Sequence, residues 1–220
     1  MKHKCSVRIL DYGVGNLRSV FRACKFYSDD VQIASTIGQL TNATHVILPG
    51  VGAFGVAMEG LREQGFEDAI QTYIKAGRPL LGICVGLQIL YEAGNENGLH
   101  EGIGIWKGSV VHLRKFEIDN QIRVPNIGWS IVHQTPNSGN SSLLAGLQMP
   151  FYAYFAHSYA ADVCSTENVV GNLILSERKI PAVIEKGNVF GVQFHPEKSG
   201  EVGLQIIKNF LSKSEDDGNY

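Results

Sequence analysis

Pro79-Leu-Leu-Gly82-Ile-Cys84-Val-Gly86-Leu-Gln88-Ile-Leu90 is the stretch that decides the fold of this chain. It opens as an apolar strand and continues with helical character. Between the two, Gly82-x-Cys84-x-Gly86 has the spacing of the G-x-S-x-G nucleophile elbow, with cysteine in place of serine. Only small residues on either side let neighbouring backbone pass such a strained turn. The pattern predicts a thiol nucleophile at a helix N-terminus, whose dipole favours thiolate. A buried core cysteine beside two incidental glycines is the alternative.

A thiolate nucleophile needs a base, and His195 has the surroundings that suit this role. It follows the apolar run 188–194, which predicts a strand, and Pro196 after it stops ladder pairing. Glu197 is close enough in sequence to orient the imidazole after one tight turn. Cys84, His195 and Glu197 are therefore a candidate Cys-His-Glu triad. A histidine that merely caps a strand end is the alternative, and Cys84 in the same chain weakens it.

Length and composition fit a single α/β domain with a full-sized core. The chain has 220 residues, is 44% hydrophobic and 18% charged, and carries a formal net charge of −2. This balance predicts no nucleic-acid partner and no anionic membrane surface. The four cysteines are widely spread without a C-x-x-C pair, so we expect reduced thiols in a cytoplasmic protein and no metal site. No signal-peptide pattern or apolar run of the ~18 residues needed for a membrane span is present.

Apolar runs alternate with amphipathic segments through the first part of the chain. Strands are expected at 6–10, 31–34 and 44–48, and helices at 17–24, 56–64 and 66–76. This alternation predicts a mainly parallel central sheet with helices on both faces and a site at the carboxyl ends of its strands. The Gly13-x-Gly15 turn resembles a dinucleotide fingerprint. Because Arg18 stands where the third glycine is needed, a tight turn is the favoured interpretation.

Shorter apolar runs in the second half predict a smaller antiparallel sheet. The expected strands cover residues 108–113, 121–124, 151–159, 169–175 and 181–185, with Lys186-Gly187-Asn188 as a hairpin turn. A closing amphipathic helix spans 202–211, and the polar residues 212–220 should be frayed. We therefore expect one domain over residues 1–220, with a core at about 5–211.

The signatures Pro79–Gln88 and Gly191–Glu197 resemble those of the class I glutamine amidotransferases. That family hydrolyses the amide of glutamine through a glutamyl thioester and delivers ammonia to a synthase. Three further stretches resemble the glutaminase subunits of imidazole glycerol phosphate synthases, namely Asp11–Ser19, Arg123–Trp129 and Tyr154–Tyr159. The resemblance runs from about Ile9 to Phe210, nearly the whole chain.

The resemblance implies a role for each matching residue. Cys84 would attack the carboxamide, His195 would transfer the proton to the leaving ammonia, and Glu197 would orient His195. Backbone N–H groups of Val51, in the Pro49-Gly50-Val51-Gly52 loop, and of Val85 would form the oxyanion hole. The implied glutamine-binding residues are Gly50, Gly52, Gln88, His157, Ser158 and Tyr159, although an aromatic core strand is the other interpretation of the last three. Asn16 and Lys198 match positions near the partner, and no metal or cofactor is implied.

The implied partner is a separate β/α-barrel synthase subunit. It would use the ammonia to make imidazole glycerol phosphate and AICAR in histidine biosynthesis. A related subunit that supplies ammonia for nucleotide-sugar modification in surface-polysaccharide pathways is a second hypothesis. A catalytically silent subunit is a third, and the intact triad argues against it.

The chain departs from the usual residues of the family at five positions outside the triad. The family more often has Leu and Met at Val85 and Leu87, His and Asn at Asn126 and Ser130, and an aromatic residue at Ala160.

Overall fold

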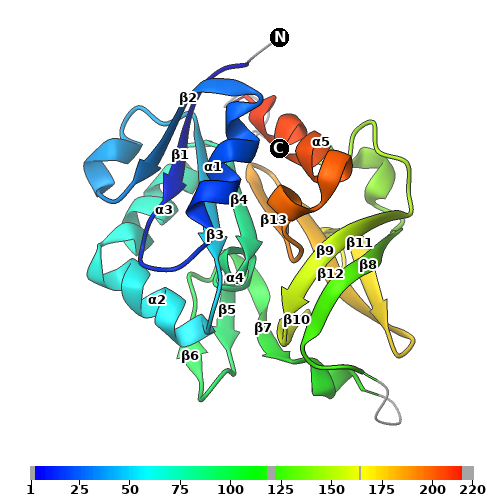
Figure 1. The fold of residues 1–220 in the computed structure, drawn as a ribbon. Coiled ribbons are helices and arrows are strands. Elements are labelled where there is room, and N and C mark those ends of the chain that lie inside the picture. Colours follow the sequence, from blue (N-terminus) through cyan, green and yellow to red (C-terminus); the bar gives the residue numbers. More distant parts are fainter. Residues whose placement is uncertain (1–2, 118–121, 164, 215–220) are drawn as a thin grey trace.

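Parallel strands form one half of the central sheet and antiparallel strands form the other half (Figure 1). The computed structural model describes residues 3–117, 122–163 and 165–214. In spatial order the nine strands are β2 (Ser28–Ala34), β1 (His3–Leu10), β3 (His45–Gly50), β4 (Leu80–Cys84), β13 (Val189–Val192), β12 (Arg178–Lys186), β11 (Val169–Leu175), β8 (Asn126–Gln134) and β9 (Phe151–His157). The strands from β2 to β13 pair in parallel, and those from β13 to β9 pair antiparallel.

The parallel half is covered by helices on both faces. α1 (Leu17–Lys25) and α5 (Gly200–Leu211) lie together on one face, and α2 (Phe54–Glu63) and α3 (Phe66–Lys75) lie on the other (Figure 1). Every residue of β3, β4 and β13 is buried, as expected for parallel strands between two helical layers. The loops between these elements contain short 3₁₀ turns, namely η1 (Ile37–Leu40), η2 (Leu113–Phe116), η3 (Ser138–Asn140) and η4 (Pro196–Lys198).

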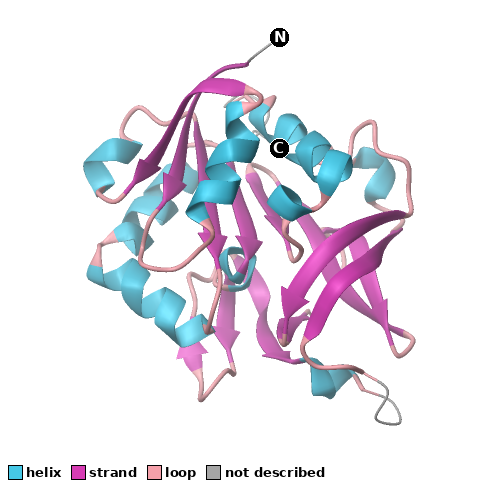
Figure 2. Cartoon of the chain, in the orientation of Figure 1, coloured by secondary structure: helices cyan, strands magenta, loops and turns pink. Residues whose placement is uncertain are grey.

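A second, four-stranded sheet lies below the large one (Figure 2). Its strands, in spatial order, are β10 (Tyr159–Asp162), β7 (Trp106–His112), β5 (Tyr91–Gly94) and β6 (His100–Glu101). β5 and β7 run parallel, whereas the two outer pairs are antiparallel. β9 passes directly into β10, so the two sheets meet at His157–Tyr159.

The predicted α/β class is confirmed, with parallel strands, helices on both faces and a smaller second sheet. The structure differs from the prediction in two respects. The antiparallel strands 151–157, 169–175 and 181–185 extend the large sheet and do not form the small one. The small sheet is mixed and not antiparallel throughout, because β5 and β7 pair in parallel. The hairpin at 186–188 is present, since Lys186 pairs with Val189.

The predicted strand at 121–124 is wrong, because residues 122–124 are not a strand and Gln121 lies outside the described residues. The predicted helix after Cys84 is present as a single turn, α4 (Val85–Gln88), and the carbonyls of the following Ile89 and Leu90 accept hydrogen bonds from the loop at 103–106. The chain then continues as β5, which the sequence reasoning did not predict. Of the tail expected to be frayed, only residues 212–214 are described.

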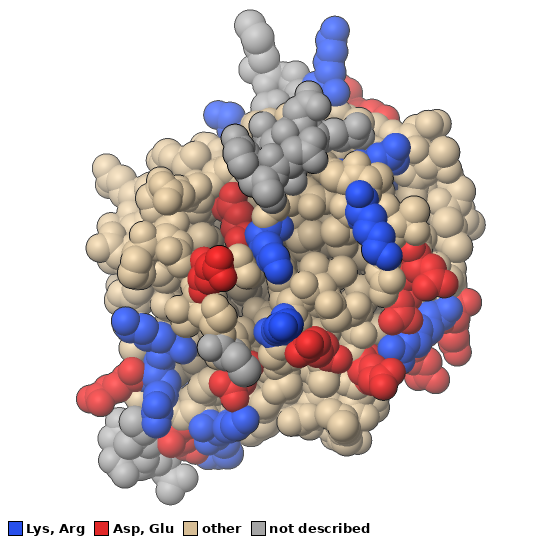
Figure 3. All heavy atoms as spheres, turned by 180° about the vertical axis from the view of Figure 1, so that it is seen from behind, with Lys and Arg blue, Asp and Glu red and all other residues tan. Residues whose placement is uncertain are grey.

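The charged side chains are mixed in sign on the face seen from behind (Figure 3). There, Lys and Arg side chains lie beside Asp and Glu side chains. Among the described residues, no helix has both the length and the apolar character needed to cross a membrane.

Candidate active site

Cys84 occupies the strained turn that its glycine neighbours predict. It is the last residue of β4 and has φ +55° and ψ −111°, a conformation that non-glycine residues rarely adopt. A Cβ on Gly86 would lie 1.8 Å from the Leu48 carbonyl oxygen, and one on Gly82 would lie 2.7 Å from the Gly86 carbonyl oxygen. The turn therefore excludes larger residues at both positions, and the nucleophile elbow is present.

His195 reaches the elbow because β13 pairs in parallel with β4. Val192 lies beside Ile83, so the segments that follow β4 and β13 leave the sheet at the same edge, where the carboxyl ends of the strands lie. The His195 backbone is fixed by its N–H, which donates to the Tyr154 carbonyl at 2.8 Å, and by its carbonyl, which accepts from the Ser199 hydroxyl at 2.7 Å. These bonds hold the imidazole on a rigid support above Cys84.

Glu197 lies on η4 and orients the imidazole. Its Oε1 is 3.0 Å from His195 Nδ1, and its side chain is only 1% exposed. A carboxylate can only accept, so Nδ1 carries the proton and Nε2 is left to face the thiol. Burial lowers the pKa of His195, but its contacts with Cys84 and Glu197 outweigh burial and raise that pKa well above its ordinary value. The helix whose N-terminus was predicted to favour the thiolate is only the single turn α4, so the helix dipole behind Cys84 is short.

A cavity of about 450 Å³ opens over Cys84 and His195. The structure brings most of the predicted site residues to its wall, including both residues proposed for the oxyanion hole. The predicted residues that line it are Val51, Gly52, Cys84, Val85, Gln88, His157, Ser158, Tyr159, His195 and Lys198. Gly50 and Asn16 are not among the lining residues. Gly50 pairs with Cys84 beneath the cavity, where a Cβ would lie 2.6 Å from the Gly86 nitrogen, and Asn16 precedes α1.

Tyr12 supports the loop that carries Val51, a contact that the sequence reasoning missed. Its buried hydroxyl donates to the Pro49 carbonyl at 2.5 Å. The loop continues through Gly52, whose φ of +92° favours glycine. A buried tyrosine hydroxyl needs a partner, but the sequence gives no sign of which carbonyl it reaches.

Gln193 contacts both Cys84 and Gln88, a role that the sequence reasoning did not predict. Its Nε2 lies 3.7 Å from Cys84 Sγ, and its Oε1 accepts from Gln88 Nε2 at 3.1 Å. The Gln88 amide also donates to the Tyr159 carbonyl at 2.8 Å. Both amide N–H groups of Gln88 are thus used within the protein, which leaves its carbonyl oxygen as the group that can accept from a substrate.

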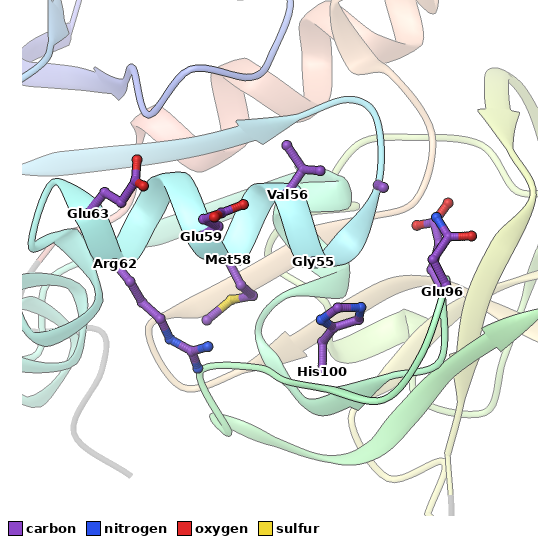
Figure 4. Close-up of a pocket in the computed structure, with 10 residues that line it drawn as sticks. Gly55, Val56, Met58, Glu59, Arg62, Glu63, Glu96 and His100 are labelled. Atoms are coloured by element: carbon purple, nitrogen blue, oxygen red, sulfur yellow. The ribbon is translucent and has the colours of Figure 1, made fainter.

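Glu96 lines both the cavity over Cys84 and a second cavity of about 620 Å³, whose lining side chains are shown in Figure 4. One carboxylate oxygen accepts from the Phe54 N–H, at the start of α2, at 2.8 Å. The second cavity runs along α2, where a Cβ on Gly55 would lie 2.6 Å from His100 Cε1. Glu96 is therefore an acidic residue in the wall of the cavity over Cys84. Sequence reasoning did not identify it because it follows β5, a strand that was not expected.

No group of three His, Cys, Asp or Glu side chains within the described ranges is arranged to hold a metal ion. The chemistry that the cavity offers is instead that of a thiol beside an oriented imidazole, with a carboxylate, an amide oxygen and backbone groups around it.

Known proteins match the chain over nearly its whole length. The family Glutamine amidotransferase class-I matches residues 8–214. Imidazole glycerol phosphate synthase subunit HisH 1 of Legionella pneumophila (strain Lens) is 40% identical over 209 residues, which are 94% of this chain and 98% of that protein. Imidazole glycerol phosphate synthase subunit HisH of Geobacillus sp. (strain WCH70) is 41% identical over 215 residues, covering 97% and 99%. The solved structure of PurLQS from Thermotoga maritima shares the fold, with a TM-score of 0.72 at 20% identity over 96% of this chain and 98% of that one.

The fold, the elbow and these matches define the class, and the chain belongs to the class I glutamine amidotransferases. Within that class, the relatives at about 40% identity over nearly the full length place it in the family of imidazole glycerol phosphate synthase subunits HisH.

Proposed function

We propose that the chain is the glutaminase subunit of an imidazole glycerol phosphate synthase. It hydrolyses L-glutamine to glutamate and ammonia and passes the ammonia to a β/α-barrel subunit that makes imidazole glycerol phosphate and AICAR. The observation that carries this proposal is Cys84, held in its strained elbow beside an imidazole that Glu197 orients, in a cavity of about 450 Å³. The names of the relatives support the acceptor chemistry.

The triad geometry supports a thioester mechanism. His195 takes the proton of Cys84, and the sulfur attacks the glutamine carboxamide carbon. The imidazolium then gives its proton to the leaving nitrogen, so the C–N bond breaks and ammonia departs. His195 next takes a proton from water, whose oxygen attacks the thioester carbonyl, and glutamate leaves as the thiolate is restored. Glu197 stabilises the imidazolium formed in both halves of the cycle.

The negative oxygen that forms at the attacked carbon needs donors, and we propose the backbone N–H groups of Val51 and Val85. Both residues lie on the wall of the cavity beside Cys84. Each N–H aimed at that oxygen is worth roughly 10²–10³ in rate. Tyr12 fixes the carbonyl of Pro49, two residues before Val51, and so limits how the loop can turn.

Glu96 is proposed as the partner of the substrate's α-ammonium group, because it is an acidic residue in the wall of the cavity. We predict that Glu96→Gln raises the KM for glutamine by about 10–100-fold, the value of one charge-assisted hydrogen bond, and leaves kcat within a few-fold. Glu59→Gln removes a carboxylate from the second cavity alone and is the matched control. Steady-state kinetics in the presence of the partner would check this. A Glu96 variant with unchanged KM would remove Glu96 from the substrate site.

An exposed apolar face beside the cavity mouth supports a protein partner. On β8, Ile127 is 63% exposed and Trp129 is 56% exposed, and on β9 Tyr152 is 59% exposed. Val51, in the Pro49–Gly52 loop, is 40% exposed. Large exposed apolar groups that lie together mark interaction sites. Lys198, whose ammonium lies 5.5 Å from the Tyr154 ring centroid, adds a cation between this face and the cavity. We propose this face, together with Asn16, as the docking surface for the synthase subunit.

Glutamate release from glutamine by the purified chain with its synthase partner tests the proposed function. We expect glutamate and the synthase product to form in equal amounts. A complex that forms but releases no glutamate would overturn the proposal.

A further inference from the structure

Asn126 lies against a histidine of the cavity over Cys84 and fixes the hydrogen-bonding state of its ring. It begins β8, and its Cα pairs directly with that of His157, the last residue of β9. The Asn126 amide nitrogen lies 3.0 Å from His157 Nε2. Asn126 is thus half-buried behind a histidine that lines the catalytic cavity.

The hydrogen bonds of His157 fix which ring nitrogen carries the proton. Nδ1 lies 2.9 Å from the Tyr159 carbonyl oxygen, which can only accept, so the proton is on Nδ1. Nε2 then presents a lone pair to the Asn126 amide, which donates. The Ser130 hydroxyl, 3.5 Å from Asn126 Oδ1, donates to the other end of the amide and favours this orientation.

His157 is 6% exposed, and burial is the largest influence on its protonation. Phe155 packs against the ring, Cys84 and His195 share the cavity with it, and Glu96 and Lys198 lie at the cavity wall. Burial lowers the pKa of His157 to about 4, with an opposing contribution from the Tyr159 carbonyl and a further lowering by His195. His157 is therefore neutral at pH 7.

The state of His157 reaches the substrate site through one shared oxygen. The Tyr159 carbonyl accepts from both His157 Nδ1 and Gln88 Nε2, at 2.9 and 2.8 Å. Gln88 in turn contacts Gln193, which approaches the sulfur of Cys84. A change of tautomer at His157 would remove one of the two donors at Tyr159 and loosen this chain of contacts.

We propose that Asn126, supported by Ser130, is a positioning residue that locks His157 as the neutral Nδ1–H tautomer and so prevents a second cation from forming beside His195. An amide does not titrate, so the lock holds at every working pH. An imidazole at this position, by contrast, could donate, accept or become charged. The inference rests on the proposed glutaminase function for its effect on rate, but not for the state of His157.

The tautomer can be read directly by long-range ¹⁵N–¹H NMR of the full chain labelled in histidine, with the His157 signals assigned by their loss in His157→Gln. We expect the neutral Nδ1–H form in the wild type, with no titration of His157 above pH 5. A wild-type His157 that carries its proton on Nε2, or that titrates near the ordinary histidine value, would overturn the proposal.

Asn126→Asp tests the lock by replacing the donor with a group that only accepts. A carboxylate beside Nε2 favours the imidazolium, so the pKa of His157 should rise by about 1–3 units. Protonated His157 should destabilise the imidazolium of His195, and kcat/KM should therefore fall roughly 10-fold or more as pH drops through the new pKa, recovering at higher pH. Gln134→Glu adds the same charge at the exposed end of the same strand and should leave the profile as in the wild type.

Two outcomes separate the inference from the proposed function. If the wild-type chain with its partner hydrolyses glutamine but His157 titrates alike in the wild type and Asn126→Asp, the inference is wrong and the function stands. If the wild type shows no glutaminase activity while Asn126→Asp raises the pKa of His157, the proposed function fails and the lock is supported. Should Asn126→Asp not fold, Asn126→Leu removes the donor without a charge and should shift His157 towards a mixture of tautomers. An unchanged tautomer in Asn126→Leu would overturn the proposal.

Discussion

Cys84→Ala is expected to abolish glutamine-dependent synthesis and to leave synthesis from ammonium salt largely intact. The reason is the proposed division of labour, in which Cys84 releases ammonia and the partner uses it. Loss of a nucleophile of this kind lowers kcat by roughly 10⁶. The elbow should accommodate alanine, because the substitution removes only the thiol group, which faces a cavity, and adds no atoms that could collide with the backbone. Product formation should be measured with each nitrogen source at a pH at which free ammonia is present.

Cys24→Ala is the matched control, because Cys24 is a fully buried cysteine on α1 outside the cavity. It should retain glutamine-dependent turnover, with some loss of stability from the smaller side chain. The assignment of Cys84 would be refuted by a variant that binds its partner yet loses activity with both nitrogen sources.

His195→Ala should have the second largest effect and lower glutaminase turnover by about 10⁴–10⁶, because base and nucleophile act as a unit. Glu197→Gln should cost less, since it removes the orienting charge and leaves the imidazole in place. In the folded protein, contacts with Cys84 and Glu197 raise the pKa of His195. Glu197→Gln removes one of these contributions, so the pKa of His195 should fall. The alkaline limb of the pH–rate profile should therefore shift to lower pH.

Kinetics of both variants with the partner present, across pH, would check these expectations. His133→Ala serves as a control, since this half-buried histidine is on β8 and does not line the cavity. Near-wild-type glutamine hydrolysis by His195→Ala would show that another group is the base.

The parts of the site that could be predicted are those in which one short segment fixes the geometry. The two glycines around Cys84 indicate an elbow because a side chain there would collide with backbone. His195 and Glu197 are close in sequence, so their contact follows from one turn. Parallel pairing of β13 with β4 then brings the two segments together.

The parts that could not be predicted depend on contacts between distant segments. Tyr12, Gln193 and Glu96 are each held in place by hydrogen bonds to residues far away in sequence. β8 was missed because its side chains are mostly half-exposed on both faces and its apolar pattern is weak. That α4 is only one turn could not be predicted, because the carbonyls of Ile89 and Leu90 just after it accept from residues 103–106, a loop that the sequence does not place there.

The glycine-rich loop that carries Val51 suggests how hydrolysis is coupled to the partner. Tyr12 holds the Pro49 carbonyl, but the following Gly50–Val51 peptide can rotate at low cost at the glycine, and Val51 is exposed next to the proposed docking face. We hypothesise that the isolated chain holds the Val51 N–H away from the substrate, and that the loaded partner favours the orientation that completes the oxyanion hole. This arrangement would prevent the loss of glutamine and ammonia when no acceptor is bound.

The most direct test of the account is glutamine turnover by the chain alone, with the barrel subunit, and with the barrel subunit plus acceptor. If one oxyanion donor is gained on coupling, turnover should rise by roughly 10²–10³ between the first and the last condition. The ribonucleotide phosphoribulosyl-formimino-AICAR phosphate should give this rise, and a nucleotide sugar should not. A chain that is as fast alone as in the loaded complex, or that responds only to the nucleotide sugar, would contradict the account.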